Sequence, residues 1–298
     1  MQLKDLRWFC LAVDRGSLHA AADELAVTQP ALSKAVRRLE AALGAQLLER
    51  MPRGVAPTGV GQLLYQRARA LGNWVHDTEV LVQDLKTGQS GQLRVGVVPA
   101  MVESVLTPVL ADFLSEGPGA TFQTSVQLSG ALLHELESGA LDFAIAAMHP
   151  DRSPPALSCL PLGTQRSSIV ARKEHPLFRR RFTIKDLGNE QWVLPPANIT
   201  LRGWVDSMFR RAGVAATPGF VYTDATPAVF AQLVRRTSLL TVMADDSLRA
   251  AGSAGLAALG EPAPTWALKI GLFWRRNAYF SSLMERFRDR VHLAFAER

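Results

Sequence analysis

The chain is poor in the features that mark several large protein classes. Only two cysteines occur in 298 residues, so a disulfide framework is excluded. No apolar run reaches the roughly 18 residues that a membrane-spanning helix needs, and the chain is charged from Lys4 onward, unlike a signal peptide. We therefore expect a cytoplasmic protein. Cys10 falls among apolar helical positions and is interpreted as a buried hydrophobe, whereas a redox role for Cys159 stays open.

Signatures of catalysis and of metal binding are also lacking. The six histidines are scattered, and none shows metal-ligand spacing such as His-x-x-x-His. Neither a Gly-x-Ser-x-Gly nucleophile elbow nor a Gly-rich phosphate loop is present. We expect no catalytic residue, no metal and no cofactor, and an enzyme is the least favoured class.

The composition indicates a folded protein with a modest positive charge. Hydrophobic residues make up 48% and charged residues 20% of the chain, and 298 residues suit about two domains. The net charge of +6 favours a polyanionic partner without proving one. Part of this charge lies in clusters that we interpret as solvated surface or subunit contacts: Arg179–Arg181, Arg210-Arg211, Arg235-Arg236 and Arg275-Arg276.

Three short helices are predicted at the N-terminus. Apolar residues recur at three- and four-residue spacing over residues 3–14, which predicts an amphipathic helix: Leu3, Leu6, Phe9, Cys10 and Val13. Gly16 ends this helix, and Ser17 is a natural N-cap for the next, whose small residues 20–22 allow close packing. Thr28 caps a third helix, with Pro30 in its first turn, where a missing N–H is tolerated.

The third helix has two distinct faces. One is an apolar stripe that should face the core: Leu32, Val36, Leu39 and Leu43. Gln29, Ser33 and Arg37 lie at i, i+4 and i+8 on another face, flanked by Lys34 and Arg38. Gln can bind adenine through two hydrogen bonds, Ser can bond several bases, and Arg can bind guanine or phosphate. A solvated polar face is the alternative, but the tight turn and the two caps favour a helix that reads the major groove of DNA.

This segment resembles the winged helix-turn-helix of LysR-type transcriptional regulators. The resemblance covers nearly all of residues 3–62 and rests on Gly16-Ser17-Leu18, Ala20-Ala21-Ala22, Leu25, Thr28-Gln29-Pro30-Ala31-Leu32-Ser33, Val36, Leu39-Glu40, Leu43-Gly44, Leu47-Leu48-Glu49-Arg50, Pro57-Thr58 and Gly61. It departs at His19, where the family often has a hydroxyl residue, which bears on one phosphate contact and not on the fold. The resemblance implies DNA contacts by Ser17, Thr28, Gln29, Pro30, Ser33, Lys34, Arg37 and Arg38, and by Arg50 and Arg53 on the wing. Arg53 is alternatively a plain turn residue beside Gly54.

A long helix is predicted over residues 58–87, with Thr58 as its cap. Apolar and small residues alternate four and three positions apart and form a heptad seam: Leu64, Ala68, Leu71, Val75, Thr78, Val82 and Leu85. Packing on its own domain is the alternative. No nearby segment could cover the seam, so we expect dimerisation, as the resemblance also implies. Two recognition helices would then meet successive major grooves of an interrupted dyad operator.

From residue 92 onward, strand and helix patterns alternate. Strands are expected at residues 93–98, 121–126, 142–146, 168–171, 192–194, 220–222, 239–242 and 267–274, and helices near 105–113, 131–137, 201–211, 228–235 and 279–296. This order predicts an α/β fold whose parallel sheet is covered by helices. The region, above all residues 136–145, resembles the LysR-type effector-binding domain, which implies a periplasmic-binding-protein-like architecture of two subdomains joined by two crossing strands.

The expected organisation therefore has three parts. A winged helix-turn-helix DNA-binding domain occupies residues 1–57, and a linker and dimerisation helix with its polar hinge occupies residues 58–89. An α/β effector-binding domain covers residues 90–298. By the resemblance, its subdomain I spans about 90–162 and 266–298, and its subdomain II spans about 163–265.

Ligands of open parallel sheets bind beyond the carboxyl ends of strands, beside helix N-termini. That rule selects the following effector-binding candidates: Ala100, Met101, Ser129, Gly130, Ala147, Asn198, Thr200, Arg202, Thr223 and Asp224. Several helix N-termini at one crevice suit a small anion such as a carboxylate, with Arg202 as its partner. Alternatively, Ser129, Thr200 and Thr226 are only N-caps. The family often has Ser or Thr where this chain has Ala100, so the pocket is expected to be more apolar there.

The leading hypothesis is a ligand-responsive transcription factor in which an effector alters the closure of two subdomains and hence the geometry of a homodimer or homotetramer. Its partners would be double-stranded DNA, a small organic effector and, for an activator, RNA polymerase, with no membrane. A solute-binding or transport protein is the alternative, but it predicts a signal peptide and leaves residues 1–62 unexplained. The residues do not distinguish activation from repression, nor do they name the effector or the target genes.

Overall fold

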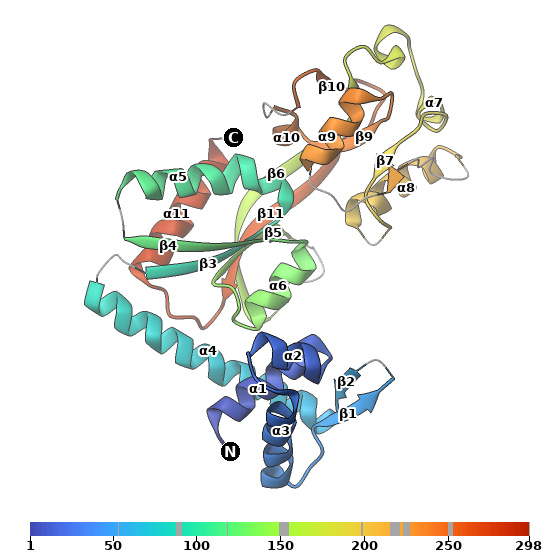
Figure 1. The fold of residues 1–298 in the computed structure, drawn as a ribbon. Coiled ribbons are helices and arrows are strands. Elements are labelled where there is room, and N and C mark those ends of the chain that lie inside the picture. Colours follow the sequence, from blue (N-terminus) through green and yellow to red (C-terminus); the bar gives the residue numbers. More distant parts are fainter. Residues whose placement is uncertain are drawn as a thin grey trace. The chain divides into compact units, whose positions relative to one another are not determined.

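The computed structural model describes residues 1–52, 54–87, 91–117, 119–148, 155–197, 199–214, 221–222, 227–249 and 253–297. The chain divides into two compact units (Figure 1). The first, the N-terminal unit, is built mainly from residues 1–88. The second, the C-terminal unit, is built from most of the residues that follow.

The N-terminal unit contains three short helices, a hairpin and a long helix: α1 (Leu3–Arg15), α2 (Leu18–Glu24), α3 (Gln29–Leu43), β1 (Leu48–Met51), β2 (Gly54–Pro57) and α4 (Gly59–Thr87). Local signals define the helix ends. Gly16 ends α1 with a left-handed φ of 58°. The Ser17 hydroxyl accepts the N–H of Ala20 at 3.3 Å, and the Thr28 hydroxyl accepts the N–H of Ala31 at 3.4 Å. The predicted helices and caps of this region are confirmed.

The helices of the N-terminal unit share one apolar core. Phe9 of α1 and both Leu32 and Leu39 of α3 are completely buried in it. Leu64 of α4 packs against the same core. The apolar stripe predicted on α3 is therefore confirmed over most of its length, whereas Leu43 at its end is exposed.

Close backbone approaches hold the β1–β2 hairpin, called the wing, against the helices. Val55 donates its N–H to the carbonyl of Gly16 at 2.8 Å. A Cβ at Gly54, where φ is 132°, would lie 2.0 Å from the same carbonyl oxygen. At the start of α4, a Cβ at Gly61 would lie 2.0 Å from the carbonyl oxygen of Leu47. Glycine is thus required at both crossings for steric reasons.

A polar network anchors the first part of α4 to α1. The Tyr65 hydroxyl donates to Asp14 Oδ1 at 2.5 Å, and Arg69 forms an ion pair with the same carboxylate. Burial and the bond to Asp14 raise the pKa of Tyr65 to about 12. The phenol therefore stays protonated at neutral pH and remains the donor in this network.

Subdomain I of the C-terminal unit has a sheet in the order β4-β3-β5-β11, in which β11 spans Trp266–Arg275. Its elements are β3 (Gly91–Val97), η1 (Pro99–Met101), η2 (Val102–Leu106), α5 (Thr107–Ser115), β4 (Ala120–Val126), α6 (Ser129–Glu137), β5 (Phe143–Ala147) and α11 (Ser282–Ala296). The first three strands are parallel. Phe143 of β5 meets Phe287 of α11 with ring centroids 5.3 Å apart. Ala144, the next residue, packs with Leu132 of α6. Helices therefore cover both faces of the sheet.

Subdomain II shares the long strands β6 (Leu157–Arg172) and β11 with subdomain I. It contains the remaining elements: η3 (Pro176–Arg179), α7 (Ile184–Leu187), β7 (Val193–Leu194), α8 (Thr200–Arg211), β8 (Val221–Tyr222), α9 (Pro227–Arg236), β9 (Thr241–Ala244), α10 (Asp245–Arg249) and β10 (Leu256–Ala258). Two apolar clusters lie on opposite faces of its strands. Ile169 joins a cluster with α7 and α8. The adjacent Val170 joins a cluster with α9.

The long strands β6 and β11 connect the two subdomains and differ from the prediction. They pair antiparallel from Trp266 opposite Ser167 to Arg275 opposite Leu157, so the sheet is mixed rather than parallel. Only residues 168–171 of β6 were predicted as strand. Pro161 and Gly163 interrupt the sequence pattern of its first part, because both residue types are depleted in strands.

We expect Gly61→Ala to lower the free energy of unfolding by about 1–3 kcal/mol, the usual range for overpacking. The new Cβ would meet backbone atoms of Leu47, which cannot rotate away. Urea or thermal unfolding measures this change. Gly59→Ala is the matched control, since it also lies at the start of α4 and its Cβ would meet nothing within 4 Å. Equal stability of the two variants would contradict the close approach.

Candidate DNA-binding face and effector site

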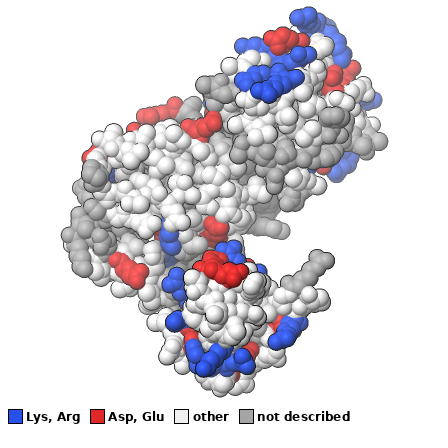
Figure 2. Space-filling view, in the orientation of Figure 1, with Lys and Arg blue, Asp and Glu red and all other residues white. Residues whose placement is uncertain are grey.

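The polar face predicted on α3 is accessible. Gln29, Lys34 and Arg37 are exposed, and Ser33 is half-buried. Arg37 Nε lies 3.4 Å from the carbonyl oxygen of Ser33, so this side chain runs along its own helix. Pro30 and Thr28 at the helix start are exposed as well. Figure 2 shows Lys and Arg side chains grouped on the lower end of the N-terminal unit.

Arg38 has a different environment from the other candidates on α3. Its guanidinium forms two hydrogen bonds with the carboxylate of Asp5 on α1, at 2.5 and 3.2 Å. The Asp5 side chain is only 3% exposed, and this pairing raises the pKa of Arg38. The geometry therefore gives Arg38 a role in holding α3 against α1, because it supplies the partner that a buried carboxylate needs.

Glu40 was missed as a residue that positions the DNA-binding elements. Its Oε1 accepts the N–H of Leu47 at 2.9 Å and the N–H of Leu48 at 3.4 Å. The carboxylate thus ties α3 to the first wing strand. Its place after the apolar Leu39 gave no signal of this contact, which depends on the chain turning back after α3.

The remaining DNA-contact candidates lie around α3. Ser17 is half-buried as the cap of α2, and Arg50 is exposed on β1 of the wing. Arg53 lies outside the described residues. Of the two wing cations predicted to contact DNA, Arg50 is therefore the one that the structure describes, and it is exposed, so it can reach a phosphate or the minor groove.

The heptad seam of α4 divides into two parts. Ala68 is buried and Leu64 is half-buried against the core of the N-terminal unit, so the alternative of packing on its own domain holds for these two. Further along the helix the seam residues are exposed: Leu71, Val75, Thr78, Val82 and Leu85. Single exposed apolar residues are normal, but a continuous stripe marks an interaction surface.

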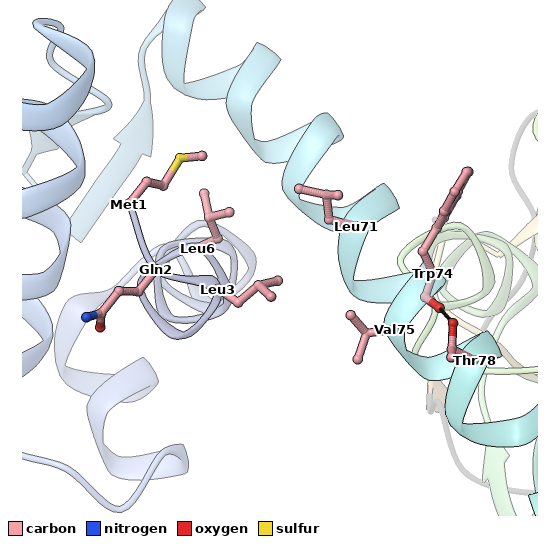
Figure 3. Close-up of a pocket in the computed structure, with 8 residues that line it drawn as sticks. All are labelled: Met1, Gln2, Leu3, Leu6, Leu71, Trp74, Val75 and Thr78. Carbon is pink, nitrogen blue, oxygen red and sulfur yellow. Dashed lines mark hydrogen bonds between the residues drawn. The ribbon is translucent and has the colours of Figure 1, made fainter. Parts of the chain in front are cut away.

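An open groove of about 400 Å³ lies between α1 and α4. Its lining is mostly apolar: Met1, Gln2, Leu3, Leu6, Leu71, Trp74, Val75 and Thr78. Figure 3 shows Leu3 from α1 and both Leu71 and Val75 from α4 directed into the gap between the helices. Trp74 is 74% exposed and lies one position from the seam. The seam therefore widens into a larger apolar surface that the heptad pattern alone did not indicate.

The effector candidates of subdomain I follow three parallel strands, so they lie at one edge of the sheet. Ala100 and Ala147 are half-buried and Gly130 is exposed, whereas Met101 is completely buried. The Ser129 hydroxyl accepts the N–H of Ala147 at 3.0 Å. This bond joins the start of α6 to the end of β5, which gives Ser129 a structural role.

The effector candidates of subdomain II are only partly described. Asn198, Thr223, Asp224 and the possible cap Thr226 lie outside the described residues. Thr200 is the first residue of α8 and is exposed; the N-cap is Ile199, which has no side-chain cap bond. The interpretation of Thr200 as an N-cap is therefore wrong.

The first turns of α8 carry Arg202 and Trp204, and Trp204 contacts a second tryptophan from β11. Arg202 is 13% exposed and donates to Asp206 at 2.9 Å, one turn further along the helix. Trp204 of α8 meets Trp266 of β11 with ring centroids 6.4 Å apart. The sequence did not indicate this pair, because its members are more than 60 residues apart.

Metal binding, membrane insertion and thiol redox chemistry each require particular groupings or environments of side chains. Among the described residues, no group of three or more His, Cys, Asp or Glu could hold a metal ion, and no helix is long and apolar enough to cross a membrane. Burial raises the pKa of Cys10 to about 12 and that of Cys159 to about 11. Both thiols are therefore protonated at neutral pH, a state that disfavours redox reactivity.

Comparisons with known proteins identify both parts of the chain. The model of the LysR substrate binding domain matches residues 86–296, and the model of the bacterial regulatory helix-turn-helix protein, lysR family, matches residues 3–62. The chain is 32% identical to the HTH-type transcriptional regulator GbpR of Azospirillum brasilense over 248 residues, which cover 82% of this chain and 72% of that relative.

Solved full-length structures share the fold. A full-length OxyR variant from Pseudomonas aeruginosa superposes with a TM-score of 0.68 at 19% identity, covering 98% of this chain and 95% of the other. CbnR in complex with its target DNA gives a TM-score of 0.61 at 20% identity, covering 99% of this chain and 100% of the other. The chain therefore belongs to the LysR family and is a ligand-responsive, DNA-binding transcriptional regulator.

Proposed function

We propose that this regulator is a cytoplasmic homo-oligomer whose α3 helices read successive major grooves of an interrupted dyad. Gln29, Ser33 and Arg37 would contact base edges, and Thr28, Lys34 and Arg50 would contact phosphates. The observation that carries this proposal is the division of α3. Its apolar stripe is buried from Leu32 to Leu39, whereas Gln29, Lys34 and Arg37 on the polar face are exposed.

Dimerisation through α4 is part of the same proposal. A single DNA-binding unit contacts too few base pairs for high specificity, and a symmetric pair doubles the site. The exposed seam from Leu71 to Leu85 and the groove beside it are the surfaces that a second copy would cover. For an activator, RNA polymerase would be a further partner.

The effector would be a small organic molecule bound where the strands of the two subdomains end. The exposed hydroxyl of Thr200 at the start of α8 supports a small anion such as a carboxylate. Arg202 would have to exchange its bond with Asp206 for a bond with the ligand. We assign no catalytic step, metal or cofactor to this site.

A footprint tests the central claim. The purified protein is incubated with DNA from upstream of its own gene and of the adjacent divergent gene at several salt concentrations. A protected interrupted dyad whose affinity falls steeply with salt supports the proposal. Absence of protection at every salt concentration would remove it.

Gln29→Ala and Arg37→Ala are each expected to weaken operator binding by about 1–3 kcal/mol, because each removes a base-edge contact. Thermal stability should stay unchanged, since both side chains are exposed. Titration of labelled operator and thermal unfolding measure the two quantities. Arg7→Ala, on the exposed side of α1, is the charge-matched control for Arg37→Ala. A stability loss as large as that of Leu39→Ala would place the substituted side chain in the core instead.

Val75→Glu is expected to shift the protein towards monomers, because it places a charge in the apolar seam that the second copy would cover. Sedimentation velocity at several protein concentrations measures the change. Ala70→Glu adds the same charge at an exposed position of α4 off the seam and should leave association intact. Equal association of both variants and the wild type would exclude this seam as the interface.

Thr200→Ala is expected to weaken the effector response roughly 2- to 10-fold, the usual effect of one lost hydrogen bond. The effector is first identified by thermal-shift screening of small carboxylates, and dose–response curves are then compared. Ser115→Ala is the control, because Ser115 ends α5 at the edge of the sheet opposite to the strand carboxyl ends. Identical curves for Thr200→Ala and the wild type would exclude this hydroxyl from the site.

A further inference from the structure

The formal charge of this regulator is concentrated outside its DNA-binding region. Residues 163–265 contain 13 Lys and Arg against 8 Asp and Glu, which makes this segment +5. Residues 1–57 contain 8 Lys and Arg against 6 Asp and Glu, which makes that segment only +2. In the latter, Arg15 is paired with Glu24 and Arg38 with Asp5. Among the described residues of this segment, the cations outside these ion pairs are Lys4, Arg7, Lys34, Arg37 and Arg50.

Five exposed cations lie on the elements that cover one face of subdomain II: Arg179, Arg181, Lys185, Arg210 and Arg211. We call them the cationic surface. Leu177 of η3, Leu187 of α7 and Phe209 of α8 pack in one apolar cluster, so the elements that carry these cations are neighbours. Figure 2 shows Lys and Arg side chains gathered at the upper end of the C-terminal unit, with a few acidic side chains among them.

The cationic surface keeps its charge uncompensated. Among the residues that the structure describes, none of its five members forms an ion pair. Asp186, the acid beside them, accepts the N–H and the hydroxyl of Thr183, both at 2.7 Å, and pairs with Arg180. Glu190 faces the buried His175 at 3.7 Å. Uncompensated exposed cations create a positive potential that attracts polyanions.

We propose that the cationic surface binds the sugar–phosphate backbone of duplex DNA that flanks the segment read by α3. This inference rests on the proposed function. Arginine guanidinium groups bind phosphate through paired hydrogen bonds and release counterions from DNA. Once α3 holds the operator, flanking DNA is present at high effective concentration, so even weak contacts are populated. An acidic protein surface would carry the same negative sign of charge as DNA, but duplex DNA is already the partner of this family.

The test compares two full-length double variants that each remove two charges. Arg179→Gln/Arg181→Gln changes the cationic surface. Arg235→Gln/Arg236→Gln changes the end of α9, which packs on the opposite face of the subdomain II strands. Binding is measured against salt concentration on a trimmed operator, which holds only the interrupted dyad read by α3, and on the same operator extended by several helical turns on each side.

On the extended fragment, the salt-dependence slope of the first variant should be smaller than that of the wild type by up to about 2 for each protomer whose cationic surface reaches the flanking DNA, since each phosphate contact contributes about 0.9. The trimmed operator and the α9 variant should behave as wild type. An unchanged slope, an equal change in the α9 variant or an equal change on the trimmed operator overturns the inference. If the first variant binds DNA like the wild type but no longer activates transcription by purified RNA polymerase, the inference is also overturned. The cationic surface would then bind a protein instead of DNA. Failure of the wild type to bind any operator would instead remove the proposed function itself.

Discussion

The β6–β11 ladder is the interaction on which the effector-binding domain depends. These two antiparallel strands run through both subdomains, and each subdomain adds its own strands to them. In subdomain I, β5 pairs with β11, and in subdomain II, β9 and β10 pair with β6. The backbone hydrogen bonds of the ladder therefore continue one sheet across the connection. The register of the ladder shifts between Ile270 and Gly271, an irregularity of the kind that bends a strand.

In the N-terminal unit, ion pairs decide which cations remain for DNA. Arg38 is bound to Asp5 and Arg69 to Asp14, and both pairs join α1 to a neighbouring helix. The buried carboxylate of Asp5 requires such a partner, since an unpaired charge is costly away from water. Arg37, one residue before Arg38, makes no such contact with α1. Adjacent arginines on one helix thus have different roles because they project from different sides of it.

Features that depend on neighbouring residues were predictable. The helices of the N-terminal unit, their caps at Ser17 and Thr28 and the terminating Gly16 follow from local hydrogen bonding and periodicity. Roles that depend on distant residues were not. The Ser129 hydroxyl bonds the N–H of Ala147, and Glu40 bonds the start of the wing. No pattern in the chain pairs such residues, because their proximity arises only when strands and helices pack.

The sequence by itself determined the helix-turn-helix, the heptad seam of α4 and the alternating elements of the effector-binding domain, since each depends on side-chain spacing that repeats with helix or strand geometry. The tertiary structure decided which of these side chains remain accessible. Packing against α1 buries Ala68 and leaves Val75 exposed on the same seam. In the effector-binding domain, the fold buries Met101, whereas Thr200 stays exposed to solvent. Burial depends on what lies opposite a residue, and that neighbour is chosen by the fold.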